Sequence, residues 1–315
     1  MISPILKICK GMQLDCPRPR WYVYLLAAVL VFGWTPLSAG LERNDFYFAS
    51  LGNTYTAMHA KESRIAMQAI LQKIFVPTHP DMRLNLDFLA QEAGLEDAFM
   101  NKPYDVIAST GLDYLRLQER FHLRPLAILS KTDRPTDAYV LVTRKDKTVK
   151  ALARLQDRRL MVEAGGSGEI ACLWLDTVLK ARGLPPHQIF FNSQRTGDKP
   201  SRILLPVFFG QADACVVTES AFDVINELNP QIEKQLVILE RSPGYISMLI
   251  SATDRLEDWA RDMVLEETER MHTYPEGRQI LTIMQMKQFF TFKPEYLKAT
   301  ETLFHSHLKQ TGGGN

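Results

Sequence analysis

The sequence predicts an α/β protein of two domains, with one domain inserted into the other. Short apolar segments that favour strands alternate with segments that favour helices along most of the chain, which is typical of mainly parallel sheets. Proline-bearing breaks at residues 133–137 and 242–244 enclose a complete β-α-β-α-β set. The length of 315 residues also suits two domains, because a domain usually takes about 100–200 residues.

The first part of the chain begins this alternation. Met67, Ile70, Leu71 and Ile74 recur at the spacing of one helical face, which predicts a helix after the break at Gly52-Asn53. The predicted strands are 46–50, 84–88, 104–108, 126–129 and 139–142, and the other predicted helices are 89–101 and 112–121.

The middle of the chain repeats the pattern. Gly183 and Pro185 end a helix over 169–181, and Pro206 interrupts one over 201–209. The remaining predicted strands are 159–163, 189–191, 212–217, 237–239 and 245–251, with a helix over 221–228 and a mostly helical remainder. We therefore expect lobe 1 to comprise 40–136 with 244–315 and lobe 2 to comprise 137–243, with two crossing segments as the hinge.

The first 39 residues predict an export signal. Four basic residues and one acid precede an uncharged apolar run from Trp21 to Trp34, and small residues follow Pro36. A basic start, a short apolar segment and a small-residue exit describe a secretory signal peptide, with cleavage expected after Ala39. An uncleaved membrane anchor is the alternative, because counting on to Leu41 just reaches spanning length. The expected location is the periplasm.

Charge and cysteine content exclude some classes of protein. The formal charge is +1, and it becomes −2 once the four basic residues and one acid of the signal are removed. Nucleic-acid binders usually carry a clear basic excess, so no nucleic-acid partner is expected. Only Cys172 and Cys215 then remain. They either pair in an oxidising compartment or stay as inert buried thiols.

A glycine-rich turn is the strongest candidate for a ligand site. Gly165-Gly166-Ser167-Gly168 follows a predicted strand and precedes a helix. Free backbone N–H groups and the positive end of the helix dipole make such a turn suitable for an anion. Neither a P-loop nor a complete dinucleotide motif is present, because the lysine of the first and the third glycine of the second are missing. A tight turn with Ser167 as a simple helix cap is the alternative.

Polar side chains also follow other predicted strands. In open α/β sheets, ligands bind beyond the carboxyl ends of the strands, so these groups are expected to converge on a small anion. The set comprises Ser50, Asn53, Ser109, Thr110, Ser193, Thr218 and Glu219.

Enzyme and metal motifs are weak by comparison. The seven histidines are scattered, and neither His-Glu-x-x-His nor Cys-x-x-Cys occurs. We therefore expect no catalytic residues, no metal site and no cofactor.

Five stretches resemble one known family. They are Tyr104–Tyr114, Leu155–Gly168, Phe209–Val217, Leu239–Pro243 and Tyr274–Leu281. Their residues and order are similar to those of the phosphate, phosphite and phosphonate-binding components of ABC transporters, a branch of the type II periplasmic-binding-protein fold. The likeness covers nearly the whole chain after the signal.

The resemblance implies a hinged, two-lobed receptor that closes on an oxyanion. Gly166, Ser167 and Gly168 match the anion-holding turn of the family, and Glu219 resembles an acidic group that holds a ligand amine in some members. We expect Tyr55 to cover the ligand. The implied partners are a small anionic ligand and a membrane permease, with the protein itself a monomer. A sensing module for a membrane kinase, or an enzyme on the same fold, stays open as an alternative.

Overall fold

The computed structural model describes residues 45–51, 60–75, 80–89, 102–145, 152–197 and 199–311. The predicted signal, the predicted helix after residue 89, and the site candidates Asn53 and Tyr55 lie outside these residues. Within the described ranges, no helix is both long and apolar enough to cross a membrane.

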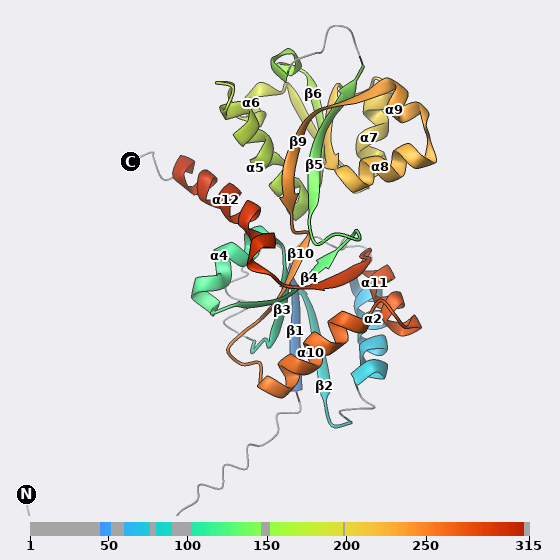
Figure 1. Ribbon diagram of the computed structural model, residues 1–315, viewed down its shortest axis with the longest axis vertical. Coiled ribbons are helices and arrows are strands. Elements are labelled where there is room, and N and C mark those ends of the chain that lie inside the picture. The colour runs from blue at the N-terminus through green and yellow to red at the C-terminus, as the bar shows by residue number, and fades with distance from the viewer. Residues whose placement is uncertain are drawn as a thin grey trace, which may run out of the picture. The chain divides into compact units, whose positions relative to one another are not determined.

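Sheet A forms the core of the first lobe (Figure 1), and its six strands come from two separate parts of the chain. The strand order is β11-β4-β10-β3-β1-β2. Strands β1, β2 and β3 are parallel, whereas β10 runs antiparallel to β3 and β4, and β11 antiparallel to β4. The strands are β1 (Asp45–Leu51), β2 (Arg83–Leu89), β3 (Val106–Ser109), β4 (Arg124–Ser130), β10 (Met248–Ala252) and β11 (Gln288–Thr291). We call this sheet with its helices lobe 1.

Helices cover sheet A, and each of its faces carries an apolar core. On one face, Ile70 of α2 (Ala60–Phe75), Ala260 of α10 (Asp258–Arg270) and Ile280 of α11 (Pro275–Ile283) pack against the sheet. On the other face, Leu115 of α4 (Gly111–Phe121) and Leu297 of α12 (Pro294–Thr311) pack against Ile107 and Leu249. Burial of these alternating strand residues holds the lobe together.

Sheet B forms the core of the second lobe, and all of its strands come from one continuous stretch. The order is β7-β6-β8-β5-β9, with β6 parallel to β7 and β8, and β5 antiparallel to β8 and β9. The strands are β5 (Asp137–Arg144), β6 (Arg159–Glu163), β7 (Ser193–Gly197), β8 (Ala214–Thr218) and β9 (Leu236–Tyr245). We call this sheet with its helices lobe 2.

Helices lie on both faces of sheet B (Figure 1). Helix α5 (Gly166–Lys180) and the short α6 (His187–Phe190) pack on one face, where Trp174 and Phe190 are buried. Helix α7 (Pro200–Phe208), α8 (Glu219–Leu228) and α9 (Gln231–Gln235) cover the other face, where Leu204 and Phe222 are buried. The burial of both faces explains the continuous apolar runs in β6 and β8.

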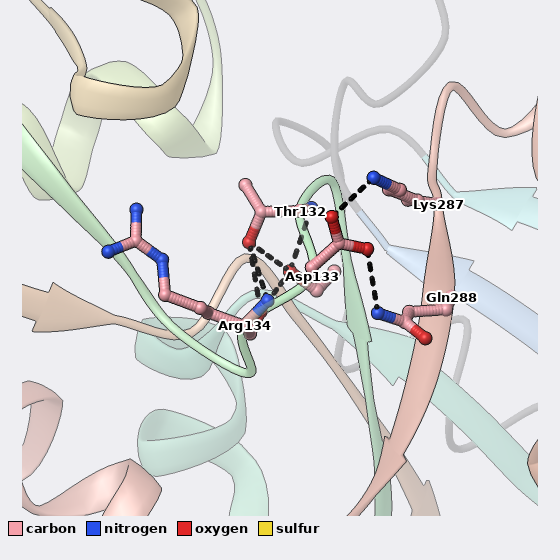
Figure 2. A network of polar contacts seen from close by, with 6 residues as sticks. Thr132, Asp133, Arg134, Lys287 and Gln288 are labelled. Atoms are coloured by element: carbon pink, nitrogen blue, oxygen red, sulfur yellow. Dashed lines mark hydrogen bonds and ion pairs between the residues drawn. The ribbon is translucent and has the colours of Figure 1, made fainter. Parts of the chain in front are cut away.

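Two crossing segments join the lobes, and they lie against each other. The segment between β4 and β5 contains Asp133, which pairs with Lys287 Nζ at 2.5 Å and accepts a hydrogen bond from Gln288 Nε2 at 3.3 Å (Figure 2). A Cβ built on Gly244 of the other crossing would lie 2.5 Å from Oγ1 of Thr136. The first crossing is therefore anchored to β11 of lobe 1, and the two crossings are in direct contact.

The structure corrects four sequence-based expectations about elements. Both sheets are mixed rather than mainly parallel. Residues 189–191 are not a strand, because α6 occupies that position and the strand follows as β7. Pro243 does not end a strand, since β9 continues through it to Tyr245. The last part of the chain, which was expected to be mostly helical, also contains strand β11. The exact lobe boundaries, 137–243 and the flanking ranges, remain a prediction.

Candidate ligand-binding site

The carboxyl edge of sheet B brings three strand ends together. Parallel strands β6 and β8 end there, at Glu163 and Thr218. Antiparallel β5 begins at the same edge, since Tyr139 pairs with Thr218. Residues that follow β6 and β8 therefore lie at the same edge as the first crossing. Ligands of open α/β sheets bind at this edge, beyond the carboxyl ends of the strands.

The glycine-rich turn after β6 has a shape that its glycines dictate. Gly165 has φ 78° and ψ −158°, a conformation that essentially only glycine adopts. A Cβ on Gly168 would lie 1.8 Å from the carbonyl oxygen of Glu163, so the helix begins too close to β6 for any side chain. The chain can turn straight from β6 into α5 only because both positions are glycine.

The first turn of α5 presents amide donors at this edge that have no partner within their own helix. The amide of Glu169 is the first that bonds within the turn, to the carbonyl of Gly165 at 3.1 Å. The amides of Gly166, Ser167 and Gly168 precede it, so they have no carbonyl of their own helix to bond. They carry the positive end of the helix dipole, which favours an anion.

Tyr139 lies beside this turn, although the sequence analysis did not select it. Its side chain interacts with Ser167 and is almost fully buried. Burial raises the pKa of Tyr139, and the charge of Glu163 raises it further, so the phenol remains a neutral hydrogen-bonding group. The ring packs near Tyr245, with the centroids 6.1 Å apart. Tyr139 thus joins the turn to the end of β9.

In lobe 1, two buried serines lie at neighbouring strand ends. Ser50 pairs with Ala108 across β1 and β3, so Ser50 and Ser109 lie on adjacent strands at the carboxyl edge of sheet A, but their side chains point to opposite faces, that of Ser109 to the face that carries α4. Their exposures are 1% and 0%, and neither Oγ has a hydrogen-bond partner among the described residues. A buried hydroxyl without a partner is costly, so these two atoms are open positions for an additional hydrogen-bonding group.

Thr110 has a structural role that limits its part in binding. It is the N-cap of α4, where its Oγ1 accepts from the amide of Asp113 at 3.1 Å and donates to Asp113 Oδ2 at 2.8 Å. The hydroxyl is therefore already used by the helix. The amides of the first turn of α4, beginning at Gly111, are the groups that remain for a ligand.

The starts of α4 and α5 approach each other across the two lobes. A Cβ built on Gly166 would lie 2.6 Å from Cγ2 of Thr110. Arg116 of α4 pairs with Glu169 of α5 and also bonds Asp113 Oδ1 at 3.1 Å. Burial lowers the pKa of Arg116, but the two carboxylates raise it by more, so the guanidinium stays charged. Asp113 and Glu169 are thereby held by Arg116, beside the free amides.

The remaining predicted residues divide into two groups. Thr218 and Glu219 lie at the carboxyl edge of sheet B, but Glu219 Oε1 is 2.6 Å from the guanidinium of Arg241. Ser193 is placed at the opposite edge, because it begins β7 and pairs with Arg159, whereas Gly197 pairs with Glu163. Four residues of strand separate Ser193 from the turn, roughly 13 Å.

The sequence analysis missed Tyr139, Arg116 and Arg241. No local signal identifies Arg116 or Arg241, because each acts through a carboxylate far away in the sequence. Tyr139 carried a weak signal, since it is the first aromatic residue after the predicted crossing at 133–137.

The sequence matches the model of one protein family. A sequence model described as "ABC transporter, phosphonate, periplasmic substrate-binding protein" matches residues 55–297. A comparison with curated proteins finds no match.

Solved structures share the fold. A binding-protein component of an ABC phosphonate transporter from Pseudomonas aeruginosa aligns with TM-score 0.59 and 14% identity, over 87% of this chain and 90% of that one. PhnD1 from Prochlorococcus marinus, solved in complex with methylphosphonate, gives 0.60 and 14%, over 84% and 99%. A Xanthomonas citri protein solved with ATP gives 0.62 and 12%, over 87% and 100%.

These matches confirm the two-lobed type II fold and the resemblance inferred from the five sequence stretches. The family match covers most of the chain, from the residues after β1 into α12. The protein therefore belongs to the periplasmic substrate-binding proteins of phosphonate ABC transporters, and it is a solute-binding protein.

Proposed function

We propose that the protein captures a small oxyanion, of the phosphonate or phosphate type, between the first turns of α4 and α5. The observation that carries the proposal is the contact between Thr110 and Gly166, which brings two positive helix ends together. Each end is equivalent to roughly half a positive charge, so an anion between them is favourable. Methylphosphonate and ATP, the ligands of two structural relatives, are both oxyanions.

The ligand is held by backbone amides and neutral hydroxyls. Amides of Gly166, Ser167 and Gly168 bind from lobe 2, and amides of Gly111 and Leu112 bind from lobe 1. The hydroxyl of Ser109, on the face of sheet A that carries α4, becomes satisfied by the ligand, which removes the cost of leaving it without a partner. Asn53 and Tyr55, which lie outside the described residues, remain candidate ligand-binding residues on the strength of the sequence alone. Closure of the two lobes removes the anion from water and strengthens these hydrogen bonds.

Glu219 selects among ligands rather than binding the anion. Its pairing with Arg241 holds its charge in place beside the carboxyl edge of sheet B. A ligand amine that displaces Arg241 would restore a charge pair, whereas a second anionic group would meet repulsion from Glu219.

Export and delivery complete the proposed function. Residues 1–39 act as a cleaved signal, and the mature protein is a periplasmic monomer that passes its ligand to a membrane permease. The protein binds its solute without changing it, as expected of a transport component, so it has no catalytic residues of its own.

Calorimetric titration of the purified protein with methylphosphonate, and separately with inorganic phosphate, tests the proposal. We expect Ser167→Pro to weaken binding of the oxyanion roughly tenfold or more, because one charge-assisted hydrogen bond contributes about 1.5–3 kcal/mol. Proline is tolerated in the first helical turn, and the preceding Gly166 has no Cβ to clash with its ring.

Ser193→Ala is the matched control, because Ser193 lies at the far edge of sheet B and its loss should leave affinity unchanged. Equal affinity in wild type and Ser167→Pro would contradict the placement of the ligand at α5. Absence of binding for every oxyanion tested would contradict the proposed ligand class.

A further inference from the structure

An ion pair between α4 and α5 joins the two lobes beside the proposed ligand site. Arg116 belongs to α4 of lobe 1, and Glu169 belongs to the first turn of α5 in lobe 2. Nη1 of the guanidinium donates to Oε2 of Glu169 at 3.3 Å, and Nη2 donates to Oε1 of the same carboxylate. Two nitrogens thus meet two oxygens, which is the stronger geometry of an arginine–carboxylate pair.

Arg116 is also held from its own lobe. Its Nη1 donates to Oδ1 of Asp113 at 3.1 Å, and the Asp113 side chain is only 2% exposed. The other oxygen of Asp113 accepts from Oγ1 of Thr110 at 2.8 Å, so the cap of α4 fixes this carboxylate. A guanidinium that a buried carboxylate already orients loses little further freedom when it binds a second one. Lobe 1 therefore presents Arg116 to Glu169 in a prepared position.

The position of Glu169 is unfavourable for anion binding on grounds of charge alone. Its carboxylate lies in the first turn of α5, in the same turn as the amides of Gly166, Ser167 and Gly168. An acid there suits the helix dipole, but it repels an oxyanion bound to those amides. If Glu169 had no further role, its removal would strengthen the binding of an oxyanion. The contact with Arg116 has the opposite effect, because it stabilises the arrangement in which the lobes meet.

Other restraints between the lobes are weaker or lie elsewhere. Cys172 and Cys215 are free thiols of lobe 2 that contact cores on opposite faces of sheet B, so the disulfide that the sequence allowed between them is not formed. A second ion pair joins Lys131, in the first crossing, to Glu163 at the end of β6. Its atoms are 3.7 Å apart, which is too long for a hydrogen bond. The bidentate pair between α4 and α5 is therefore the tighter of these two charged contacts.

We propose that Arg116 and Glu169 form a latch between the lobes that slows the release of the bound oxyanion. The inference rests on the proposed binding of the oxyanion between α4 and α5. The ion pair exists only while the lobes are together, whereas a ligand enters and leaves while they are apart. The pair must therefore break before release, and its loss changes the dissociation rate of the ligand more than the association rate. Neither side chain needs to touch the ligand for this effect.

Partial exposure limits the strength of the latch. The side chains of Arg116 and Glu169 are 38% and 33% exposed. Exposed ion pairs contribute little to stability, although bidentate geometry and a buried partner such as Asp113 place this pair above the ordinary ones. We therefore expect the latch to change the release rate about three- to tenfold, and not to decide whether the oxyanion binds at all. Added salt should weaken the latch, because it screens charges that are open to water.

The test measures release of a radiolabelled oxyanion from the full chain after an excess of the unlabelled one is added at low ionic strength. The probe is methylphosphonate or inorganic phosphate, whichever binds the wild type more tightly. We expect Glu169→Gln to release the probe about three- to tenfold faster, with an association rate that is unchanged or higher. The double variant with Arg116→Gln should release it no faster than Arg116→Gln alone, because either substitution already breaks the pair.

Arg182→Gln is the matched control. It removes the same kind of charge pair, with Glu240, but both residues belong to lobe 2. Its release rate should therefore equal that of the wild type. A second check needs no substitution, because rising salt should accelerate release from the wild type until it approaches that of Glu169→Gln.

The direction of the change in Glu169→Gln decides between the latch and simple repulsion. Slower release would overturn the latch, because it would mean that the carboxylate acts only by repelling the anion. An unchanged release rate would overturn it as well, and the proposed function would then stand, since the wild type still binds the probe. If the wild type bound neither methylphosphonate nor phosphate, the proposed function itself would be wrong, and the latch would be rejected with it.

Discussion

Each glycine of the turn before α5 is required for a different reason. Gly165 supplies a backbone conformation that other residues avoid, and Gly168 allows α5 to start against Glu163. Gly166 does not have a positive φ, so its backbone conformation does not require glycine. It must be small because it lies against Thr110 of the other lobe. Substitution of Gly166 therefore tests the approach of the lobes, whereas substitution of Gly168 tests the folding of lobe 2.

We predict that Gly166→Ala weakens oxyanion binding about tenfold or more by holding the lobes apart. The new Cβ meets Cγ2 of Thr110, and Thr110 cannot rotate away without losing the hydrogen bonds that cap α4. Calorimetry measures the affinity, and urea unfolding should show little change in the free energy of unfolding.

Gly168→Ala is the comparison variant, and it should lower the free energy of unfolding by about 3 kcal/mol or more through overpacking. If Gly166→Ala bound oxyanions as tightly as wild type, the contact with Thr110 would have no part in closure.

Sequence could identify polar residues at strand ends, but it could not show which of them were already in use. Ser109 and Thr110 are adjacent hydroxyl residues before α4, yet Thr110 is consumed by the helix cap and Ser109 has no partner among the described residues. Glu219 was correctly placed after β8, but its pairing with Arg241 depends on a strand that is distant in the sequence. Such partnerships follow from the tertiary fold.

At the scale of elements, one short apolar segment shows why strand prediction fails locally. Ile189, Phe190 and Phe191 suggest a strand by composition, but an apolar run this short fits a helix equally well. Pro186 and the cap from Asp176 start a helical turn at His187. Phe190 is then fully buried, whereas the side chain of Ile189 is 72% exposed. Only one side of this helical turn therefore packs against the core of lobe 2. Because α6 replaces the predicted strand, Ser193 begins β7 and lies at the edge of sheet B opposite the site.

Helix α12 was expected to be a helix, but its position could not be anticipated. Leu297 packs in the core beside α4, whereas Leu303 packs in the core of lobe 2 with Trp174 and Tyr245. The helix therefore joins both lobes in addition to the two crossings. A sequence pattern gives the apolar face of a helix but does not name the two surfaces that it will contact.

We predict that Leu303→Ala lowers the free energy of unfolding by about 2–4 kcal/mol, as expected for a buried leucine. Leu303 is 4% exposed, and its loss leaves a cavity between α12 and lobe 2. Urea unfolding followed by tryptophan fluorescence measures the change, because Trp174 lies in the same core.

Leu308→Ala is the matched control, since it makes the same chemical change on the same helix at a side chain that is 47% exposed. It should alter stability by no more than about 0.5 kcal/mol. Equal losses in the two variants would mean that α12 is not held by its contact with lobe 2.

At the scale of the whole molecule, the alternation of strands and helices correctly predicted two lobes with one inserted in the other. The antiparallel members β10 and β11 were harder to predict, because their direction depends on where the chain re-enters lobe 1. The predicted export signal, residues 1–39, belongs to the same scale, because it would decide where the protein goes.

We predict that protein recovered from the periplasm of a producing bacterium begins at Gly40. Small residues before the cleavage position suit a signal peptidase, so Ala39→Phe should leave residues 1–39 attached. Intact mass measurement separates the two products. A full-length wild-type chain found in the membrane fraction would instead show that the segment is an uncleaved anchor.

The central position of β10 in sheet A has a consequence for the order of folding. β10 lies between β3 and β4, so sheet A cannot be completed from residues 45–130 alone. All strands of lobe 2, from β5 to β9, precede β10 in the sequence. During synthesis, which starts at the N-terminus, the whole of lobe 2 is therefore made before β10. Long-range strand pairing is slow, because a long loop must close before the pairs form. Lobe 2 is therefore expected to fold first. Strand β10 then pairs with β3 and β4, which completes sheet A.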